Sequence, residues 1–409
     1  MYAQFSVNSL FMPFADRARL SAMMFLNYVI WGCWYVTLGT YLTKTLKFSG
    51  TEAGLVFGTT AVAAMISPFF VGLIADRFFA TEKMLAVLHL LGAGLLFAVT
   101  KVTDFGSVYA LMLIYCLCYF PTIALTNSLA LQHIKEPGRD FPLLRVFGTL
   151  GWIAIGVALS ALKIEENATP FLLAAGASVI MAGFSLILPH TPPTGKGKVV
   201  TMRDILGLDA LVMMKDPSFL VFAIGSVLAC IPLTFYFSFP NAYLNDVHVQ
   251  DAAAKMTLGQ ASEVGMMLLM PFIFRRISVK WVLLMGLGAW AVRYALLAYG
   301  NADTGIWMFY LAIALHGVCY DFFFMTGQLY TDQQAPASLR SSAQGLITFL
   351  TYGVGMFAGS LLSGRALDVF TSSPGHVDWQ LFWLSSGAGA FVILLLIAGL
   401  FRNQSKVAA

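Results

Sequence analysis

Four charged residues lie deep inside long apolar stretches of the sequence, where a charge calls for a chemical explanation. The acids are Glu263 and Asp321. The bases are Arg145 and Arg293, so the set is formally neutral. A charge in an apolar medium is costly unless it is paired or hydrated, so we expect these side chains to face each other or a polar cavity. A carboxyl group removed from water favours its protonated form, which makes the two acids candidates to carry protons.

Glu263 has an amide neighbour one helical turn earlier, because Gln260 precedes it in the segment LGQASEV. Side chains three residues apart share a helix face. An amide and a carboxylate together donate and accept hydrogen bonds, so the pair can bind a polar solute. The alternative is a contact between packed helices, because Gln and Glu also hydrogen-bond across neighbouring membrane helices.

Asp321 lies among aromatic residues in the segment HGVCYDFFFMTG. Tyr320 precedes it and three phenylalanines follow. An acid beside aromatic rings fits a site that stacks a ring and hydrogen-bonds hydroxyl groups. His316, in the same segment, either joins a proton path or is a buried polar residue with local partners.

Arg145 begins a polar and aromatic stripe in the segment DFPLLRVFGTLGW. Thr149 and Trp152 follow at i+4 and i+7, which continues one helix face. We expect this stripe to line a solute cavity, with snorkelling of Arg145 to the nearer membrane surface as the alternative. Arg293, in WAVRYALLAYG, is interpreted as a structural pair or a snorkelling side chain, with a functional role as the alternative.

The same spacing occurs in the first apolar segment, which carries Asn27, Trp31 and Trp34 at i, i+4 and i+7. The fourth apolar segment adds Thr122 and Asn127. Stripes of this kind on several helices predict a central cavity for a solute.

The amino-acid composition indicates whether these residues are surrounded by water or by lipid. Of the 409 residues, 59% are hydrophobic and only 11% are charged, against roughly 25% charged residues in soluble domains. A single soluble core cannot hide so much apolar surface, so the chain is predicted to lie in lipid.

Neither the cysteines nor the net charge points to a cofactor or a nucleic acid. All five cysteines fall in apolar stretches, without a CxxC or a His/Cys cluster, so we expect no disulfide, no metal and no other cofactor. The net charge of +4 is spread over short loops, with no basic run that would indicate nucleic-acid binding.

A helix needs about 20 apolar residues to cross a bilayer, and this window predicts an all-α membrane protein with twelve transmembrane helices. The predicted spans are 20–42, 52–75, 83–100, 106–130, 143–162, 169–189, 217–242, 254–274, 281–299, 305–328, 341–364 and 379–401. The first span lacks a basic leader and a cleavage site, so we expect a retained helix and not a signal peptide.

The longest polar connection divides these spans into six plus six. This arrangement predicts two six-helix bundles related as parallel repeats, at 1–189 and 217–409. The connection, 190–216, is predicted to be a cytoplasmic linker with a short interfacial helix at LGLDALVMM.

Lys and Arg residues are distributed unevenly between the two sides of the predicted membrane. Sixteen fall on the side that carries both termini and six on the opposite side. Because short cytoplasmic loops are enriched in Lys and Arg, both termini of this multi-pass chain are expected in the cytoplasm.

The segment GLIADRFFATEK resembles the loop-2/3 motif of the major facilitator superfamily. The matching features are Gly72, the pair Asp76 and Arg77, and a trailing base. A glycine lets two helices approach, and an Asp–Arg pair can latch the cytoplasmic ends of two bundles, so we interpret this as a gating motif. Phe79 and Ala80 replace the usual Gly and Arg or Lys.

A wider likeness covers nearly the whole chain. The sequence resembles the bacterial nucleoside:proton symporter family of that superfamily in NYVIWGCWYVTLGTYL, YFPTIALTNSLAL, DFPLLRVFGTLGW, LGLDA, QASE, HGVCYDFFF and LRSSAQGL. The resemblance implies a major facilitator fold and proton-coupled uptake of nucleosides across the bacterial inner membrane by alternating access. The expected partners are a nucleoside, protons and membrane lipid, the chain is expected to be a monomer, and no enzymatic activity is implied.

The resemblance also implies roles for single residues. Asp321 and Glu263 are expected to couple proton movement to the solute. The residues expected to bind the substrate are Arg145, Thr149, Trp152, Gln260, Glu263, Tyr320 and Asp321.

Four positions depart from the family's best-known members. Thr234 and Phe237 stand where those members carry Gln and Asn. His316 replaces a tyrosine, and Trp152 replaces a phenylalanine. These changes alter the contacts around the solute, so the choice among nucleosides is open.

Other classes of membrane protein are alternatives to this interpretation. A sugar or drug carrier of the same superfamily fits the acids equally, because sugars present the same hydroxyl pattern. A channel would need a ring of like charges or a filter loop, and neither is visible. A receptor that does not transport is separated from a carrier by proton-dependent counterflow.

Overall fold

The structure, a computed structural model, describes residues 13–71, 79–193, 201, 203, 206–373 and 376–402. The predicted gating motif, with Gly72, Asp76 and Arg77, lies outside the described residues. Among the described residues, eleven helices are long and apolar enough to cross a membrane, and a twelfth apolar helix is shorter. Each predicted span thus coincides with an apolar helix.

The first half of the chain contains α1 (Phe14–Tyr35), α2 (Leu38–Thr40), η2 (Tyr41–Thr45), α3 (Gly50–Phe70), α5 (Thr81–Val99), α6 (Phe105–His133), α7 (Pro137–Ala161) and α8 (Thr169–Ser185). The start of the second half contains η4 (Leu208–Lys215), α10 (Pro217–Ser238), α11 (Pro240–Asp246), α12 (Ala252–Phe274), α13 (Val279–Tyr299), α14 (Ile306–Ala314) and α15 (His316–Tyr320). It continues with η5 (Asp321–Met325), α16 (Thr326–Gln334), η6 (Ala337–Leu339), α17 (Arg340–Thr348), η7 (Phe349–Gly355), α18 (Met356–Val369), β1 (Thr371–Ser373), β2 (His376–Val377) and α19 (Trp379–Leu400).

Polar side chains begin several of the apolar helices. Ser49 and Glu52 form a capping box at the start of α3. Asp104, Asp216 and Asp378 each accept a hydrogen bond from a backbone N–H in the first turn of α6, α10 and α19. These caps satisfy backbone N–H groups that have no partner inside the helix, at the points where the chain re-enters the apolar layer.

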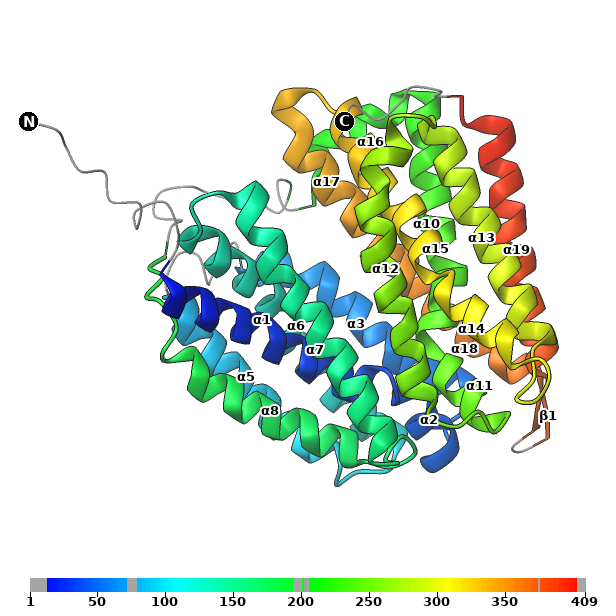
Figure 1. The fold of residues 1–409 in the computed structure, drawn as a ribbon, viewed down its shortest axis with the longest axis horizontal. Coiled ribbons are helices and arrows are strands. Elements are labelled where there is room, and N and C mark those ends of the chain that lie inside the picture. The colour runs from blue at the N-terminus through cyan, green and yellow to red at the C-terminus, as the bar shows by residue number, and fades with distance from the viewer. Residues whose placement is uncertain are drawn as a thin grey trace, which may run out of the picture.

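Helices of each half pack mainly against one another. In the first half, α1 packs on α7 and α8, and α5 packs on α6 and α8. In the second half, α10 packs on α18 and α19, and α13 packs on α19 and α14. Figure 1 shows the first half in blue to green and the second in green to red, converging at the end that carries α2, α11 and β1. The small antiparallel pair of β1 and β2 is an addition to the predicted all-helical chain.

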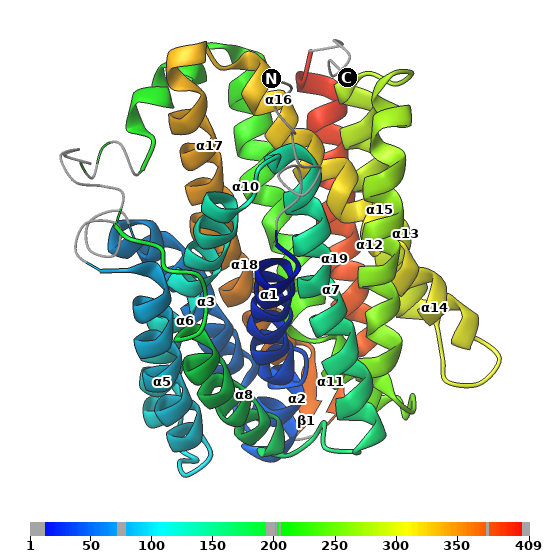
Figure 2. The same cartoon turned by 60° about the vertical axis from the view of Figure 1, so that its left-hand side comes forward.

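The largest contacts between the halves, among the described residues, are those of α3 with α18 and of α7 with α12. Figure 2 shows these pairs on either side of α1. Glycines permit the close approach of α3 and α18, because a Cβ on Gly54 would clash with the backbone of Ser360. Gly156 on α7 has the same role, since its Cβ would lie 2.7 Å from the Thr257 side chain of α12.

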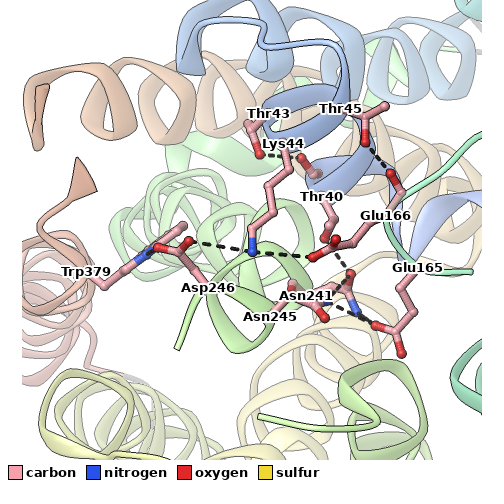
Figure 3. Close-up of polar contacts among 11 residues, drawn as sticks. Thr40, Thr43, Lys44, Thr45, Glu165, Glu166, Asn241, Asn245, Asp246 and Trp379 are labelled. Atoms are coloured by element: carbon pink, nitrogen blue, oxygen red, sulfur yellow. Dashed lines mark hydrogen bonds and ion pairs between the residues drawn. The ribbon is translucent and has the colours of Figure 1, made fainter. Parts of the chain in front are cut away.

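Polar groups from both halves meet at the converging end, which we call the closed end (Figure 3). Glu165, between α7 and α8, accepts hydrogen bonds from Asn241 Nδ2 at 2.7 Å and Asn245 Nδ2 at 3.1 Å. Lys44 Nζ lies 3.6 Å from both Glu166 and Asp246. The closed-end network consists of Thr40, Lys44, Ser160, Glu165, Glu166, Asn241, Asn245 and Asp246.

The predicted linker helix at LGLDALVMM is confirmed in a tighter form. Residues Leu208–Lys215 form a 3₁₀ helix, η4, that begins after Gly207. Gly207 has φ +64°, and its Cβ would clash with the backbone of Ser342 on α17. A glycine is therefore required where the linker packs against the second half.

Candidate functional site

Arg145 lies on α7 where this helix packs closely against α1. Gly148 permits the approach, because a Cβ there would lie 2.8 Å from the Tyr28 ring. The Arg145 guanidinium lies over that ring, 4.4 Å from its centroid, which is a cation–π contact. This predicted site residue is half-buried and has a partner inside the protein. Thr149, one turn further along α7, is half-buried as well.

Gln260 and Glu263 lie on α12, opposite α7. Both are half-buried, and neither forms a hydrogen bond with another described residue. Arg145 and Glu263 interact electrostatically across the contact between the two helices, but no ion pair within 4.0 Å joins them. The amide and the carboxylate therefore keep their hydrogen-bonding capacity for a solute.

Asp321 opens η5, a five-residue π-helical segment within the tenth membrane-spanning unit. Such π-helical turns occur frequently at functional sites. Asp321 is only 2% exposed, and its Oδ2 atom has no hydrogen-bond partner. The η5 segment packs against α12. The tenth span thus brings a second acid toward the acid on α12.

Tyr320, directly before Asp321, forms a hydrogen bond with Tyr352, hydroxyl to hydroxyl. Tyr352 lies on η7, another π-helical segment. The Tyr352 ring also lies 6.1 Å from the Phe324 ring of η5, between centroids.

A chain of aromatic rings crosses from the first half of the protein to the second. Successive ring centroids are 5.4 to 6.5 Å apart, within the range of favourable aromatic pairs. We call this chain the aromatic band. Its rings, in order, are Trp31, Trp152, Tyr35, Phe237, His316 and Tyr320.

One end of the band carries a further unpaired polar atom. Trp31 Nε1 is buried and has no hydrogen-bond partner. Buried indole N–H groups normally donate a hydrogen bond, so this atom is available to a bound solute.

The stripe predicted on the first span is only partly correct. Asn27 is buried inside the first half, where its amide and carbonyl bond Thr126, Thr122 and Tyr119. Trp34 donates to the Tyr115 hydroxyl at 3.0 Å. Trp34 lies against Tyr35 of the band, but its N–H group, like the Asn27 side chain, is bonded within the first half, whereas the Trp31 N–H group has no partner.

Sequence reasoning missed three tyrosines at this site: Tyr28, Tyr35 and Tyr352. Each touches a predicted residue, through the Arg145 guanidinium, the Trp152 ring and the Tyr320 hydroxyl. Tyrosines are frequent in these spans, and the sequence offers no signal that separates those facing a cavity from those within the packing.

Arg293 is completely buried, which decides between pairing and snorkelling. Its guanidinium lies 3.1 Å from the Tyr236 ring centroid. Its Nη1 atom lies 3.2 Å from His316 Nδ1. Arg293 is thus paired within the protein and does not snorkel. His316 correspondingly has local polar partners.

Comparison with known proteins now identifies the family. The model of the nucleoside H⁺ symporter family matches residues 15–406. The chain belongs to this family. The predicted family is therefore confirmed, and with it the classification as a membrane transporter and not an enzyme.

Relatives match over nearly their whole length. The protein YegT of Escherichia coli (strain K12) is 42% identical, covering 95% of this chain and 94% of YegT. The xanthosine permease of the same organism is 36% identical, covering 94% of this chain and 96% of the permease. The crystal structure of the nucleoside transporter NupG superposes with a TM-score of 0.89 at 30% identity, covering 95% of this chain and 99% of NupG.

These similarities confirm the predicted fold class and function. The chain has the twelve-helix fold of major facilitator transporters and is a multi-pass membrane protein. Its family function is nucleoside transport coupled to protons.

Proposed function

We propose that this transporter imports nucleosides together with protons by alternating access, and that the site between α7, α12 and η5 binds both. The observation that carries the proposal is the aromatic band, which runs between the two halves and reaches two acids. His316 Nε2 lies 3.9 Å from Glu263, and Tyr320 directly precedes Asp321, whose Oδ2 atom has no hydrogen-bond partner. A nucleoside offers a flat base and a ribose with hydroxyl donors, which are the complements of rings and carboxylates.

The residues divide naturally between the two parts of a nucleoside. Trp152 and Tyr320, which belong to the band, would stack the base. Gln260 and Glu263 would hydrogen-bond the ribose hydroxyls, with Arg145 and Thr149 completing the polar side of the pocket. A charge-assisted bond from a hydroxyl to a carboxylate is stronger than a bond between neutral groups.

Asp321 is proposed as the principal proton carrier, with Glu263 linked to it. A buried carboxylate without hydrogen-bond donors is costly when ionised, so binding a proton or a donor group relieves that cost. Coupling follows if the loaded site closes readily with a proton bound and poorly without one. The free energy of the proton gradient then drives the solute in one direction.

Alternating access requires two bodies that move relative to each other. We propose that these are the bundles 1–189 and 217–409, joined by the linker 190–216, with the loop-2/3 motif gating one end. The Lys and Arg bias supports an inner-membrane orientation with both termini in the cytoplasm. In this orientation the closed end lies on the outer side of the membrane, because Lys44, Lys163 and Lys255 belong to the side opposite the termini.

Uptake into proteoliposomes containing only this protein and lipid tests the proposal. A radiolabelled nucleoside should accumulate above its external concentration when the interior is alkaline, and a protonophore should abolish the accumulation. Equal rates with and without the gradient would contradict coupling. Competition by unlabelled hexoses, with none by nucleosides, would replace the nucleoside assignment by a sugar carrier.

A further inference from the structure

Arg293 is a permanently charged side chain buried in the second half of the protein. It is 0% exposed, and within the described part of the chain no carboxylate lies within 4.0 Å of its guanidinium. Instead the cation lies over the Tyr236 ring and bonds His316 Nδ1. An arginine buried in a membrane span is costly and usually functional, so its placement against His316 needs a reason.

The contact determines which ring nitrogen of His316 carries the proton. A guanidinium has five N–H donors and no acceptor. His316 Nδ1 must therefore accept, which leaves the single proton of the neutral imidazole on Nε2. That Nε2 atom lies 3.9 Å from Glu263 Oε2. Arg293 thus turns the N–H side of the ring toward the acid proposed to bind the solute.

The orientation of the ring is also restricted sterically. Tyr236 stacks on His316 with centroids 5.5 Å apart and an interplanar angle of 24°. On the other side, a Cβ on Gly259 of α12 would lie 3.3 Å from His316 Cβ. The ring is confined between α10 and α12, so it cannot turn about its Cβ–Cγ bond without moving Tyr236 or α12.

We propose that Arg293 is a positioning residue that acts through His316 on Glu263. It holds the Nε2–H group as a fixed donor beside the carboxylate, which orients Glu263 for the solute. The separation of 3.9 Å exceeds a hydrogen bond, so a small movement of the carboxylate engages or releases the donor. The inference rests on the proposed role of Glu263 in binding the nucleoside.

Nucleoside uptake kinetics of Arg293→Met and Arg293→Lys test the inference. Arg293→Met should raise KM about tenfold with little change in kcat, the smaller loss expected for a hydrogen bond to a charged group. Arg293→Lys retains a cationic donor and should keep KM within about threefold of wild type. Arg276→Met, at an exposed arginine after α12, is the matched control and should leave KM unchanged.

Two His316 variants distinguish the roles of the two ring nitrogens without changing Arg293. Gln can present an amide N–H near the Nε2 position, toward Glu263. Asn is one methylene shorter and presents its amide near Nδ1, toward Arg293. His316→Gln should therefore keep KM closer to wild type than His316→Asn, and the reverse order would overturn the inference.

A double-mutant cycle excludes a merely structural role. If Arg293 acts only through His316, Arg293→Met should have no further effect on KM in the His316→Phe background. An equal rise in both backgrounds, or an unchanged KM in Arg293→Met alone, would refute the positioning role. Proton-driven uptake by the wild type, measured in parallel, reports separately whether the proposed function stands. If Arg293→Met does not fold, the KM values of Arg293→Lys and of the two His316 variants decide whether Arg293 has the positioning role.

Discussion

Two buried carboxylates in this protein have opposite surroundings. Glu165, at the closed end, is 6% exposed and accepts hydrogen bonds from Ser160, Asn241, Asn245 and the Ala253 backbone. Asp321, in the middle of the tenth span, is 2% exposed, and its Oδ2 atom accepts none.

The difference assigns distinct roles to the two regions. A carboxylate surrounded by donors ties together the elements that supply those donors. The donors to Glu165 come from α7, α11 and α12, so this acid joins the two halves. A carboxyl group without donors is completed only by a proton or a ligand. The carboxylate at the closed end is therefore satisfied by the protein, whereas Asp321, in the candidate site that we call the mid-membrane site, keeps one carboxylate oxygen without a partner.

The largest effect is expected from Asp321→Asn, which keeps the shape of the side chain but cannot take up a proton. We expect concentrative uptake to be abolished, while exchange of labelled for unlabelled nucleoside across the membrane persists. Accumulation driven by an imposed proton gradient is the measurement. Asp303→Asn, at an exposed loop position, serves as the control. Wild-type accumulation by the Asp321 variant would remove this residue from the coupling step.

A smaller effect is expected from Glu263→Ala and Gln260→Ala. Each removes a group that we place on the solute, and loss of a hydrogen bond to a charged group costs about 1.5–3 kcal/mol, or roughly tenfold to a hundredfold in affinity. Glu263→Ala should be the more damaging of the two, because its bonds are charge-assisted. Binding titrations on purified variants give the affinity, and thermal unfolding gives the stability. Unchanged affinity with a marked loss of stability would favour the helix-packing interpretation.

At the closed end, Glu165→Gln should act on conformation and not on binding chemistry. The new amide would point N–H groups at the donors of Asn241 and Ala253, so the contact between the halves weakens. We expect cysteines introduced at this end to react faster with a polar thiol reagent, and uptake to change only a few-fold. Asp303→Asn, at an exposed loop position outside this network, is the control. Identical labelling rates in both variants would show that Glu165 does not hold the closed end.

Much of the mid-membrane site was predictable because charged residues are rare in apolar membrane spans and are therefore conspicuous there. Glu263 and Asp321 stand out as acids in apolar spans, and the family likeness assigned their neighbours. The closed-end network gives no such signal. Glu165 and Asn241 are ordinary polar residues near span ends, separated by 76 positions in the chain. Only the packing of the two halves brings them together.

The prediction of a cavity-facing stripe on the first span was only partly correct, for a related reason. In a soluble helix, polar residues mark the face toward water, but in a membrane the outer face is as apolar as the core. Asn27 and Trp31 share a spacing, yet Asn27 bonds Thr126 within its own half while Trp31 reaches Trp152. The direction of a polar stripe is therefore set by tertiary partners that periodicity does not reveal.

The smallest effect concerns which nucleosides the mid-membrane site accepts. Thr234 stands where the best-known family members carry a carboxamide, but its hydroxyl donates to the Ile231 carbonyl at 2.7 Å. The same hydroxyl oxygen lies against Gly359 of α18. Thr234 is thus occupied within the helix packing, and Phe237 contributes a ring to the aromatic band.

Base selection should consequently rest on stacking, which tolerates many rings, while the acids select the sugar. We expect ribonucleosides with different bases to compete for uptake within about threefold of one another, a spread below 1 kcal/mol. Free nucleobases and 2′,3′-dideoxynucleosides should compete poorly, because they lack the hydroxyl donors that Glu263 requires. Competition by nucleobases as strong as that by nucleosides would contradict the assignment of Glu263 to the ribose. Strong discrimination between bases would instead place an unrecognised hydrogen-bonding group, such as Trp31 Nε1, against the base edge.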